Sequence, residues 1–206
     1  MYVKSNKRKL QAEQTKRLIY KTAAKLFSCK NYNDVTIEEI ADASGVSVGT
    51  FYHYFKNKQE IFAIFYKTLD DEYQNFYIKM ADEAEHIKLS PIQKLEVFLL
   101  HTTELIAKQG IEFLRVIYPY MLQDKEFGDS MVLPERNFFR IVRELIDNGK
   151  TCGEISSDIM TDQIISDITI ICRGCEVDWC INRGRDSIRD HSVSAIKNYL
   201  RGISSR

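Results

Sequence analysis

Residues 36–58 read TIEEIADASGVSVGTFYHYFKNK, and this stretch decides the fold that the sequence predicts. Thr36 is followed three residues later by Glu39, which is the pattern of a capping box at the start of a helix. Gly45 fits the left-handed conformation that ends a helix, and Ser47 can cap the helix that follows. The pattern therefore predicts two short helices joined by a tight turn at residues 44–47.

The second of these helices, at about 48–54, suits insertion into the major groove of DNA. A helix with its side chains is ~10–12 Å wide, and the major groove is ~12 Å wide. Gly49 costs up to ~1 kcal/mol against alanine inside a helix, and a close approach of the backbone to DNA explains it. Thr50 can hydrogen-bond with a base or contact a thymine methyl group. Phe51 and Phe55, four residues apart, are expected to pack inward.

The flanks of the two helices carry candidate phosphate contacts. Thr36 and Lys58 stand at helix N-termini, where backbone amides together with a hydroxyl or an ammonium group bind phosphate. Tyr52, His53 and Tyr54 carry polar tips on rigid rings that can reach phosphates or base edges. On these residues alone, a plain helical hairpin with an aromatic core remains the alternative.

The net charge of zero hides an uneven distribution of charge along the 206 residues. Residues 1–30 hold nine Lys or Arg and one acidic residue, whereas residues 61–206 hold eighteen basic and 23 acidic residues. This asymmetry indicates that only the basic head meets a polyanion, although a solvated lysine-rich helix fits the same counts. No apolar run reaches the ~18 residues of a membrane span. No apolar block follows the basic N-terminus either, so we expect a cytoplasmic protein with no membrane partner.

Apolar spacing beyond residue 58 predicts helices and no strand. A long helix is expected from Asn57 to about residue 80, and another begins at Ser90-Pro91. Further helices are expected at 111–123, where Pro119 should kink or break the helix, and at about 130–148, 158–182 and 187–203. With the basic helix at about 11–30 and the two short helices, the sequence predicts an all-α fold of about nine helices.

The last two expected helices carry more apolar surface than one core needs. The helix at 158–182 has two apolar stripes, and the helix at 187–203 has a narrow seam with spacings of 3, 4 and 3 residues. We expect the surplus to pair with a second copy around a two-fold axis in a four-helix interface, the alternative being a fully internal helix in a monomer. The residues expected at this interface are Ile165, Cys172, Trp179, Val193, Ile196, Leu200 and Ile203.

The residue types that carry enzyme chemistry are sparse. The four histidines are scattered without metal-type spacing, and Gly45-x-x-x-Gly49 lacks the Gly-Lys-Ser/Thr ending of a nucleotide-binding loop. Cys172 and Cys175 lie in an apolar helical pattern and are expected to be small buried hydrophobes rather than a zinc or redox pair. We therefore expect no enzyme activity, no metal and no cofactor.

Residues 14–62 resemble the DNA-binding domain of TetR-type (TetR/AcrR) transcriptional regulators. The matching pattern runs through Ala23/Ala24-x-Leu26-Phe27, Thr36-Ile37-x-x-Ile40-Ala41, Gly45-Val46-Ser47-x-Gly49-Thr50-Phe51-Tyr52-x-Tyr54-Phe55 and Lys56-x-Lys58-x-x-Ile61. Val48 departs from the polar or basic residue that the family often has there, which suggests an apolar contact at that base step.

The resemblance implies a helix-turn-helix DNA-binding domain at residues 1–60 and a ligand-binding and dimerisation domain at 61–206. It implies a homodimer, most often a repressor, that binds a palindromic operator in double-stranded DNA and is released by a small-molecule effector. The DNA contacts that it carries over are Thr36, Ser47, Val48, Gly49, Thr50, Tyr52, Tyr54 and Lys58, with His53 facing either solvent or a phosphate.

The effector pocket is expected between the long helix and the helices at about 90–122 and 158–182. Its candidate walls are Phe98, Phe113, Tyr118, Met121 and Trp179. The supply of apolar side chains favours a hydrophobic or aromatic effector, although rings at helical spacing also suit a plain core. Two alternatives stay open: a DNA-binding dimer without a small-molecule effector, and a redox sensor that uses Cys172 and Cys175.

Overall fold

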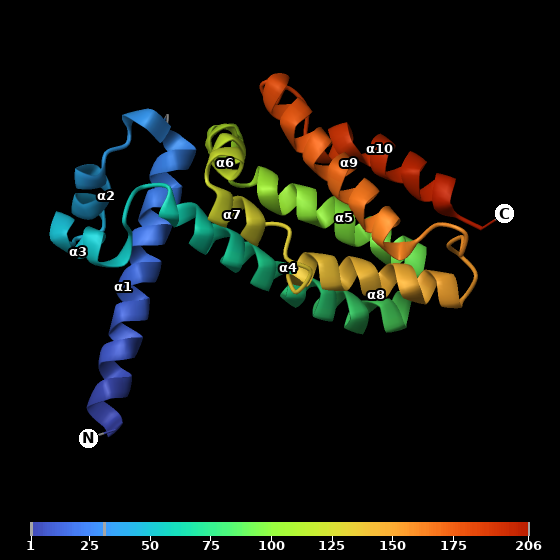
Figure 1. The fold of residues 1–206 in the computed structure, drawn as a ribbon, viewed down its shortest axis with the longest axis horizontal. Coiled ribbons are helices and arrows are strands. Elements are labelled where there is room, and N and C mark those ends of the chain that lie inside the picture. The colour runs from blue at the N-terminus through green and yellow to red at the C-terminus, as the bar shows by residue number, and fades with distance from the viewer. Residues whose placement is uncertain (1, 31, 206) are drawn as a thin grey trace.

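The computed structural model describes residues 2–30 and 32–205, and within them the fold is all-α, as the sequence predicts. The elements are α1 (Tyr2–Cys29), the 3-10 turn η1 (Tyr32–Asp34), α2 (Ile37–Ala43), α3 (Val48–Tyr54), α4 (Glu60–Ile87), α5 (Pro91–Ala107), α6 (Ile111–Gln123), α7 (Lys125–Ser130), α8 (Asn137–Thr151), α9 (Thr161–Ile181) and α10 (Ile188–Ile203). Figure 1 shows α1–α3 as a head at one end and α4 running from the head into a bundle with α5, α8, α9 and α10.

The head has its own apolar core. Ile19, Ala23 and Phe27 of α1 are buried together with Ile40 of α2 and Phe51 of α3. Because the three residues of α1 are spaced by four, they form one stripe along that helix, and the two short helices pack onto it. The opposite side of α1 carries lysines and stays exposed, so the head keeps a basic surface.

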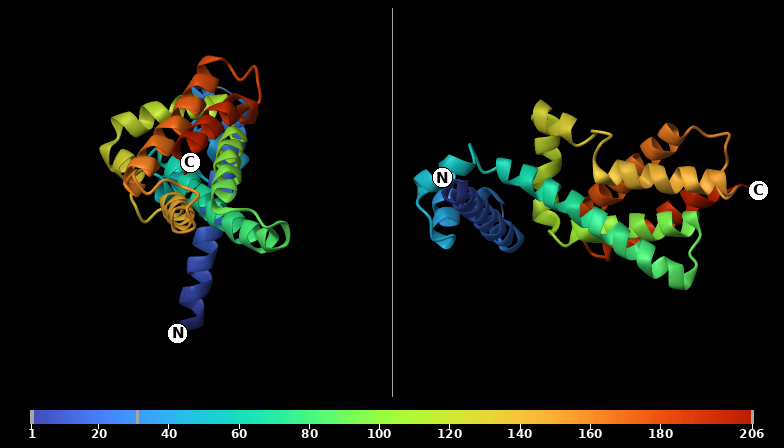
Figure 2. Two further views of the ribbon diagram at one scale, coloured as in Figure 1. Left: turned by 90° about the vertical axis from the view of Figure 1, so that its right-hand side faces the viewer. Right: turned by 90° about the horizontal axis from the view of Figure 1, so that it is seen from below.

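The bundle forms around α5, which packs against α4, α8, α9 and α10. Its Leu95, Phe98 and Leu99 are almost completely buried, and α4 adds Leu69 and Tyr73 to the same core. Figure 1 and the right-hand view of Figure 2 show α6 and α7 next to the head, at the end of the bundle nearest to it. In the described part of the chain, no helix combines the length and the apolar character that crossing a bilayer requires.

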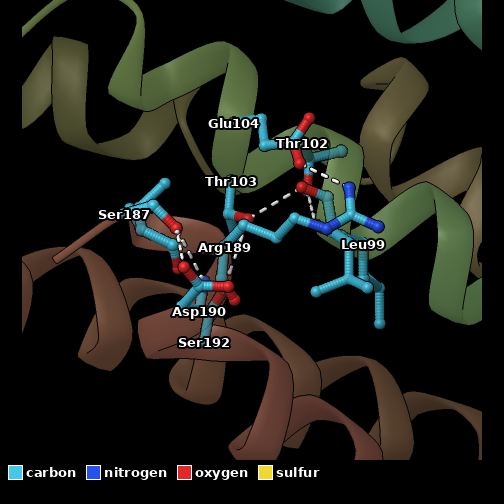
Figure 3. Close-up of polar contacts among 10 residues, drawn as sticks. Leu99, Thr102, Thr103, Glu104, Ser187, Arg189, Asp190 and Ser192 are labelled. Atoms are coloured by element: carbon cyan, nitrogen blue, oxygen red, sulfur yellow. Dashed lines mark hydrogen bonds and ion pairs between the residues drawn. The ribbon is translucent and has the colours of Figure 1, made fainter.

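Polar groups join α5 to α10 inside the bundle (Figure 3). The hydroxyl oxygens of Thr103 and Ser192, both fully buried, are 3.5 Å apart. At the edge of the same contact, Arg189 Nη1 donates to Glu104 Oε1 at 2.5 Å. These contacts hold α10 along α5, so that the apolar side of α10 faces its own chain.

This packing corrects the expected use of the apolar seam. Ile196, Leu200 and Ile203 of α10 are each at most 3% exposed, and Val193 is half-buried. On α9, Ile165, Cys172 and Trp179 are buried as well. A stripe in a sequence shows that a helix needs an apolar partner, but here α5 and α9 of the same chain supply it.

Several helices differ from the sequence expectation. The α1 helix begins at Tyr2 rather than near residue 11, α4 continues to Ile87 rather than to about residue 80, and α8 begins at Asn137 rather than near residue 130. The α7 helix was not expected as a separate helix. Asp124 starts α7, because its side chain accepts a hydrogen bond from the Phe127 amide at 2.8 Å. Pro119 lies inside α6, which continues to Gln123. Pro119 is exposed, so water can satisfy the carbonyl group that the proline leaves without an amide partner.

Candidate functional site

The turn between α2 and α3 is fixed by backbone hydrogen bonds. Gly45 has a φ of 66°, the left-handed region that glycine adopts without steric cost. The Val46 amide donates to the Ala41 carbonyl at 3.0 Å and the Gly45 amide donates to that of Asp42 at 2.9 Å, a Schellman ending. This ending sets the angle at which α3 leaves α2.

Both short helices have the side-chain caps that the sequence predicts. Thr36 Oγ1 accepts a hydrogen bond from the Glu39 amide at 3.1 Å. The other half of the expected capping box is replaced, because the Glu39 carboxylate pairs with Lys30. At α3, Ser47 Oγ accepts from the Thr50 amide at 3.1 Å, and the two hydroxyl oxygens are 2.9 Å apart. Ser47 and Thr50 therefore form one polar unit at the tip of α3.

The fold gives no internal reason for glycine at position 49. Gly49 is exposed, and a Cβ added there would lie 3.8 Å from Ser47 Oγ, which is an ordinary contact. Its φ is not in the left-handed region, in contrast to Gly45. A glycine inside a helix costs up to ~1 kcal/mol, and the packing of the chain does not account for it at position 49.

The side chains around Gly49 divide into an inward and an outward group. Phe51 and Phe55 are buried, as expected. The candidate DNA contacts are exposed or half-buried: Thr36, Ser47, Val48, Gly49, Thr50, Tyr52, His53 and Tyr54. Tyr52 is 53% exposed although it is a large aromatic residue, and His53 stands beside Tyr54 with ring centroids 4.9 Å apart.

Lys58 faces the head rather than the solvent. Its ammonium group donates to the carbonyl oxygens of Tyr32 and Val35, both at 2.6 Å, and lies 4.0 Å from the centroid of the Tyr32 ring. Burial lowers the pKa of Lys58, while Asp34 acts in the opposite direction. These contacts give Lys58 a structural function in holding η1, which the phosphate-anchor hypothesis did not include.

A second candidate site is a small cavity in the bundle, with a volume of about 60 Å³. It lies among α4, α5, α6, α8 and α9 and thus near the expected place. Its walls are Tyr66, Tyr73, Thr102, Ile106, Tyr118, Met121, Met131, Arg136, Phe138, Phe139, Thr169, Cys172, Arg173 and Glu176. This volume suits a few water molecules and is small beside the roughly 300–1,000 Å³ of ordinary ligand pockets.

Glu176 is the unusual group of this cavity. It is 4% exposed, and the Tyr118 hydroxyl donates a hydrogen bond to its Oε2. Burial raises the pKa of Glu176 to about 7, although the Tyr118 hydrogen bond and the charge of Arg173 act in the opposite direction. The carboxyl group is therefore close to its protonation midpoint at neutral pH.

The other cation of the cavity wall, Arg136, is already engaged. Its Nη2 is 3.3 Å from Asp70 Oδ1, and its guanidinium lies 5.5 Å from the centroid of the Tyr66 ring. Asp70 also accepts hydrogen bonds from the amides of Asn137 at 2.8 Å and Phe138 at 3.3 Å, at the N-terminus of α8. This network ties α4 to α8 at one side of the cavity.

The expected pocket residues divide between this wall and the core. Tyr118 and Met121 line the cavity, whereas Phe98 and Phe113 are buried elsewhere in the core, and Trp179 donates from Nε1 to the Asp186 carbonyl at 2.7 Å. The sequence interpretation missed Arg136, Arg173 and Glu176. One signal was available: Glu176 follows Cys172 by four residues and so shares a face with an apolar stripe.

The cavity and the head are connected through α6. Tyr118 and Met121 of α6 line the cavity, and the same helix packs against α1 and η1 of the head. The α7 helix is held tightly to α6, since a Cβ on Gly128 would lie 2.5 Å from the Met121 carbonyl oxygen. A displacement of α6 therefore acts on both sites.

The cysteines of α9 are poorly suited to redox sensing. Both Cys172 and Cys175 are free thiols, and Cys172 is buried. Burial raises the pKa of each thiol, and the nearby Glu176 raises it further. The reactive thiolate is therefore scarce at neutral pH.

Comparison with known proteins finds a family match within the head and its junction with α4. Residues 19–63 match the family model described as "Bacterial regulatory proteins, tetR family". "Transcriptional regulator AcuR" of Cereibacter sphaeroides is 28% identical over 136 residues, which are 63% of this chain and 59% of AcuR. An Escherichia coli K12 protein described as "Probable acrEF/envCD operon repressor" is 23% identical over 201 residues, 94% of this chain and 88% of that protein.

Solved structures share the whole fold. The fatty acid degradation regulator FadR of Bacillus halodurans has a TM-score of 0.70 at 18% identity, over 93% of this chain and 97% of that one. FadR of Bacillus subtilis, solved in complex with stearoyl-CoA, has a TM-score of 0.68 at 18% identity. The match covers 91% of this chain and 98% of that one. At these identities the likeness concerns the fold alone.

Proposed function

The chain is a transcriptional regulator of the TetR family, and we propose that it is a repressor that binds an inverted-repeat operator as a homodimer and leaves it when a small effector enters the cavity of the bundle. The units of this proposal are a DNA-binding domain at residues 1–60 and an effector-binding and dimerisation domain at 61–206. In it, the tip of α3 contacts bases through Ser47, Val48, Gly49 and Thr50.

The main support for the DNA contact is that α3 contains a glycine, Gly49, at an exposed position. Its position in the helix, its exposure and the open space around it leave no function for glycine within the chain. A DNA backbone or base edge in van der Waals contact with the helix would exclude a Cβ there. The basic exposed side of α1 supports the same surface, because phosphates supply most of the affinity of such complexes.

Substitution Gly49→Ala separates this function from folding. We expect the variant to be as stable as the wild type or more stable, by up to ~1 kcal/mol, because alanine favours the helix. We expect its affinity for the operator to fall by about tenfold or more, which corresponds to ~1.4 kcal/mol. Thermal unfolding and fluorescence anisotropy with a DNA sequence selected from a random pool measure the two quantities. Unchanged operator affinity in a folded variant would refute the close approach.

The proposed dimer surface is the outward side of α9 and α10, which lie side by side (Figure 1). On α9, Ile170, Val177 and Ile181 are 65%, 39% and 71% exposed. Together with the exposed Gly174 they have spacings of 4, 3 and 4, which place them on one line along the helix. The adjacent α10 exposes Ala195, a small side chain that permits close approach. A line of exposed apolar residues beside small ones suits a two-fold helix pair.

The effector would enter the cavity between α6 and α9. The five aromatic residues of the wall support an effector with an apolar body, and two FadR proteins of the same fold were solved in complex with acyl-CoA, stearoyl-CoA in one and lauroyl-CoA in the other. Since the cavity volume is only about 60 Å³, an effector must move part of the wall. Through α6 this movement reaches the head and changes the distance between the two α3 helices of the dimer.

The small volume also favours a second candidate function, a DNA-binding dimer without a small-molecule effector. The two candidates differ in one measurement. Titration of apolar compounds into the operator complex should release the DNA if the cavity is an effector site, and the same compounds should raise the melting temperature of the free protein. If compounds of no class bind the free protein, the effector-free dimer is the better account.

A further inference from the structure

The carboxyl group of Glu176 has no evident structural reason to lie inside the bundle. Buried carboxylates are rare unless a cation or several hydrogen-bond donors compensate them. Within the described residues, one hydrogen-bond donor reaches this carboxyl, the hydroxyl of Tyr118. The carboxyl lies in the cavity wall, so a group in the cavity can reach it.

The charged and titratable groups that face Glu176 come from three helices and the start of a fourth. On α9 itself they are Arg173, Cys172, Cys175 and Cys180, and α6 supplies Tyr118. From α4 come Tyr66 and Tyr73, and Arg136 precedes α8. Every tyrosine and cysteine in this set has a raised pKa, so these groups are neutral near pH 7 and do not compensate the carboxylate.

Positive charge at the site is insufficient to offset burial. Arg136 is paired with Asp70, which leaves Arg173 as the nearby cation of the wall. Arg173 and the Tyr118 hydrogen bond both favour the ionised form of Glu176, yet its pKa remains raised at about 7. A second positive group near Oε1 or Oε2 would therefore be bound favourably.

The rings around the cavity favour the same kind of ligand. Tyr66, Tyr73, Tyr118, Phe138 and Phe139 contribute to the wall. The faces of aromatic rings carry negative electrostatic potential and attract ammonium groups, most strongly where water is excluded. A carboxylate among several rings is a suitable environment for a protonated amine with an apolar body.

We propose that the effector is a compact hydrophobic amine whose ammonium group binds the Glu176 carboxylate while its apolar body lies among the rings. This inference rests on the proposed function, since it names the chemical class of its effector. The ammonium competes with the Tyr118 hydroxyl for the carboxylate and so acts on the contact between α6 and α9. A fatty acyl chain is a poor ligand for this carboxyl, because it brings no positive charge to it.

The test uses matched triplets of an arylalkyl amine, alcohol and carboxylate that share the same body, with one and with two rings. Calorimetry on the full chain at pH 6, 7 and 8 gives the affinities. We expect the amine to bind about tenfold more tightly than the matched alcohol, and the carboxylate to bind most weakly. The affinity of the amine should rise with pH and level off above about 7, because the amine needs the ionised form of Glu176.

Two variants sharpen the result. Glu176→Gln keeps an oxygen for Tyr118 but removes the charge, so we expect it to lose the preference for the amine and the pH dependence. Asp162→Asn removes an exposed carboxylate at the start of the same helix and should bind the amine as the wild type does. If Glu176→Gln does not fold, the pH dependence of amine affinity in the wild type still tests whether the amine binds the Glu176 carboxylate.

The inference is overturned if no amine binds, if a matched carboxylate binds more tightly, or if the affinity of the amine is the same at all three pH values. Operator binding, measured separately by anisotropy, distinguishes this failure from that of the proposed function. If a compound of another class releases the operator, the amine as effector is refuted, but the proposed repressor function is supported. If the amine binds but the protein binds no operator, the proposed repressor function is refuted, but the amine site is supported.

Discussion

Tyr118 of α6 donates a hydrogen bond to the buried carboxyl of Glu176 on α9. The two residues are 58 positions apart in the chain, and their hydrogen bond joins the helix that contacts the DNA-binding head to a helix of the proposed dimer surface. It is therefore a direct structural connection between the head side of the molecule and the proposed dimer surface.

Substitution Tyr118→Phe tests this connection. Removal of the hydroxyl leaves a buried carboxyl without its donor, which costs roughly 1–3 kcal/mol. We expect the free energy of unfolding in urea to fall by that amount and the pKa of Glu176 to rise further above 7. Tyr120→Phe is the control, because the Tyr120 hydroxyl donates to the half-buried Asp124 at 3.3 Å and should matter less. Equal effects of the two variants would contradict the special function of Tyr118.

The pH dependence of stability tests the state of Glu176. Its pKa in the folded chain is raised from 4.5 to about 7, so between these values the folded chain binds a proton that the unfolded chain has lost. The stability of the wild type should therefore fall as pH rises from about 5 to 7, by about 3 kcal/mol at most, and stay level above.

Glu176→Gln provides the comparison for this profile. The variant carries no titrating group at the site, so it should be more stable than the wild type at pH 8, and the difference should vanish near pH 5. Melting temperatures at pH 5, 6, 7 and 8 for both proteins measure it. A constant difference across this range would mean that Glu176 does not titrate there.

Substitution of Lys58 distinguishes a structural function of this residue from a phosphate-binding function. Its ammonium group holds the carbonyl oxygens of Tyr32 and Val35. We expect Lys58→Ala to destabilise the head by roughly 1–3 kcal/mol, because two buried acceptors lose a charged donor. Operator affinity should fall with it while the slope of log K against log salt stays the same. A slope that is shallower by about 0.9 would instead show a lost phosphate contact.

The proposed dimer surface predicts opposite results for two exposed apolar positions. A glutamate at Ile181, which is 71% exposed on α9, should separate the dimer into folded monomers because it adds like charges across the two-fold axis. Leu122→Glu on α6, where the leucine is 88% exposed and outside the surface, should leave the dimer intact. Sedimentation velocity gives the masses. A dimer that persists with Ile181→Glu would place the interface elsewhere.

The head could be predicted from the sequence in detail because its signals are local. Caps at Thr36 and Ser47, the glycine at 45 and the inward Phe51 each follow from residues within a few positions. The packing of the bundle could not be predicted in the same way, because it depends on which helices, far apart in the sequence, contact one another. The stripe of α10 could pair with a second copy or with α5, and the spacing of Ile196 and Leu200 is the same in both cases.

The wall of the cavity was only partly predictable for a related reason. Large apolar and aromatic side chains at helical spacing indicated Tyr118 and Met121, but that spacing gives no reason to choose Tyr66 or Phe138 over the fully buried Phe98. Glu176 was overlooked because a charged residue on a helix is usually assumed to face water. Only the crossing of α6 and α9 brings it to the Tyr118 hydroxyl.

The spacing of half-sites in the selected operator tests the central claim most directly. Two α3 helices related by a two-fold axis should read half-sites centred about one helical turn, 34–36 Å, apart or a multiple of it. We predict that DNA selected from a random pool contains an inverted repeat, and that inserting about 5 base pairs between its halves lowers the affinity of the dimer by about tenfold or more. Binding of a monomer, or equal affinity for the parent and the lengthened duplex, would contradict the account.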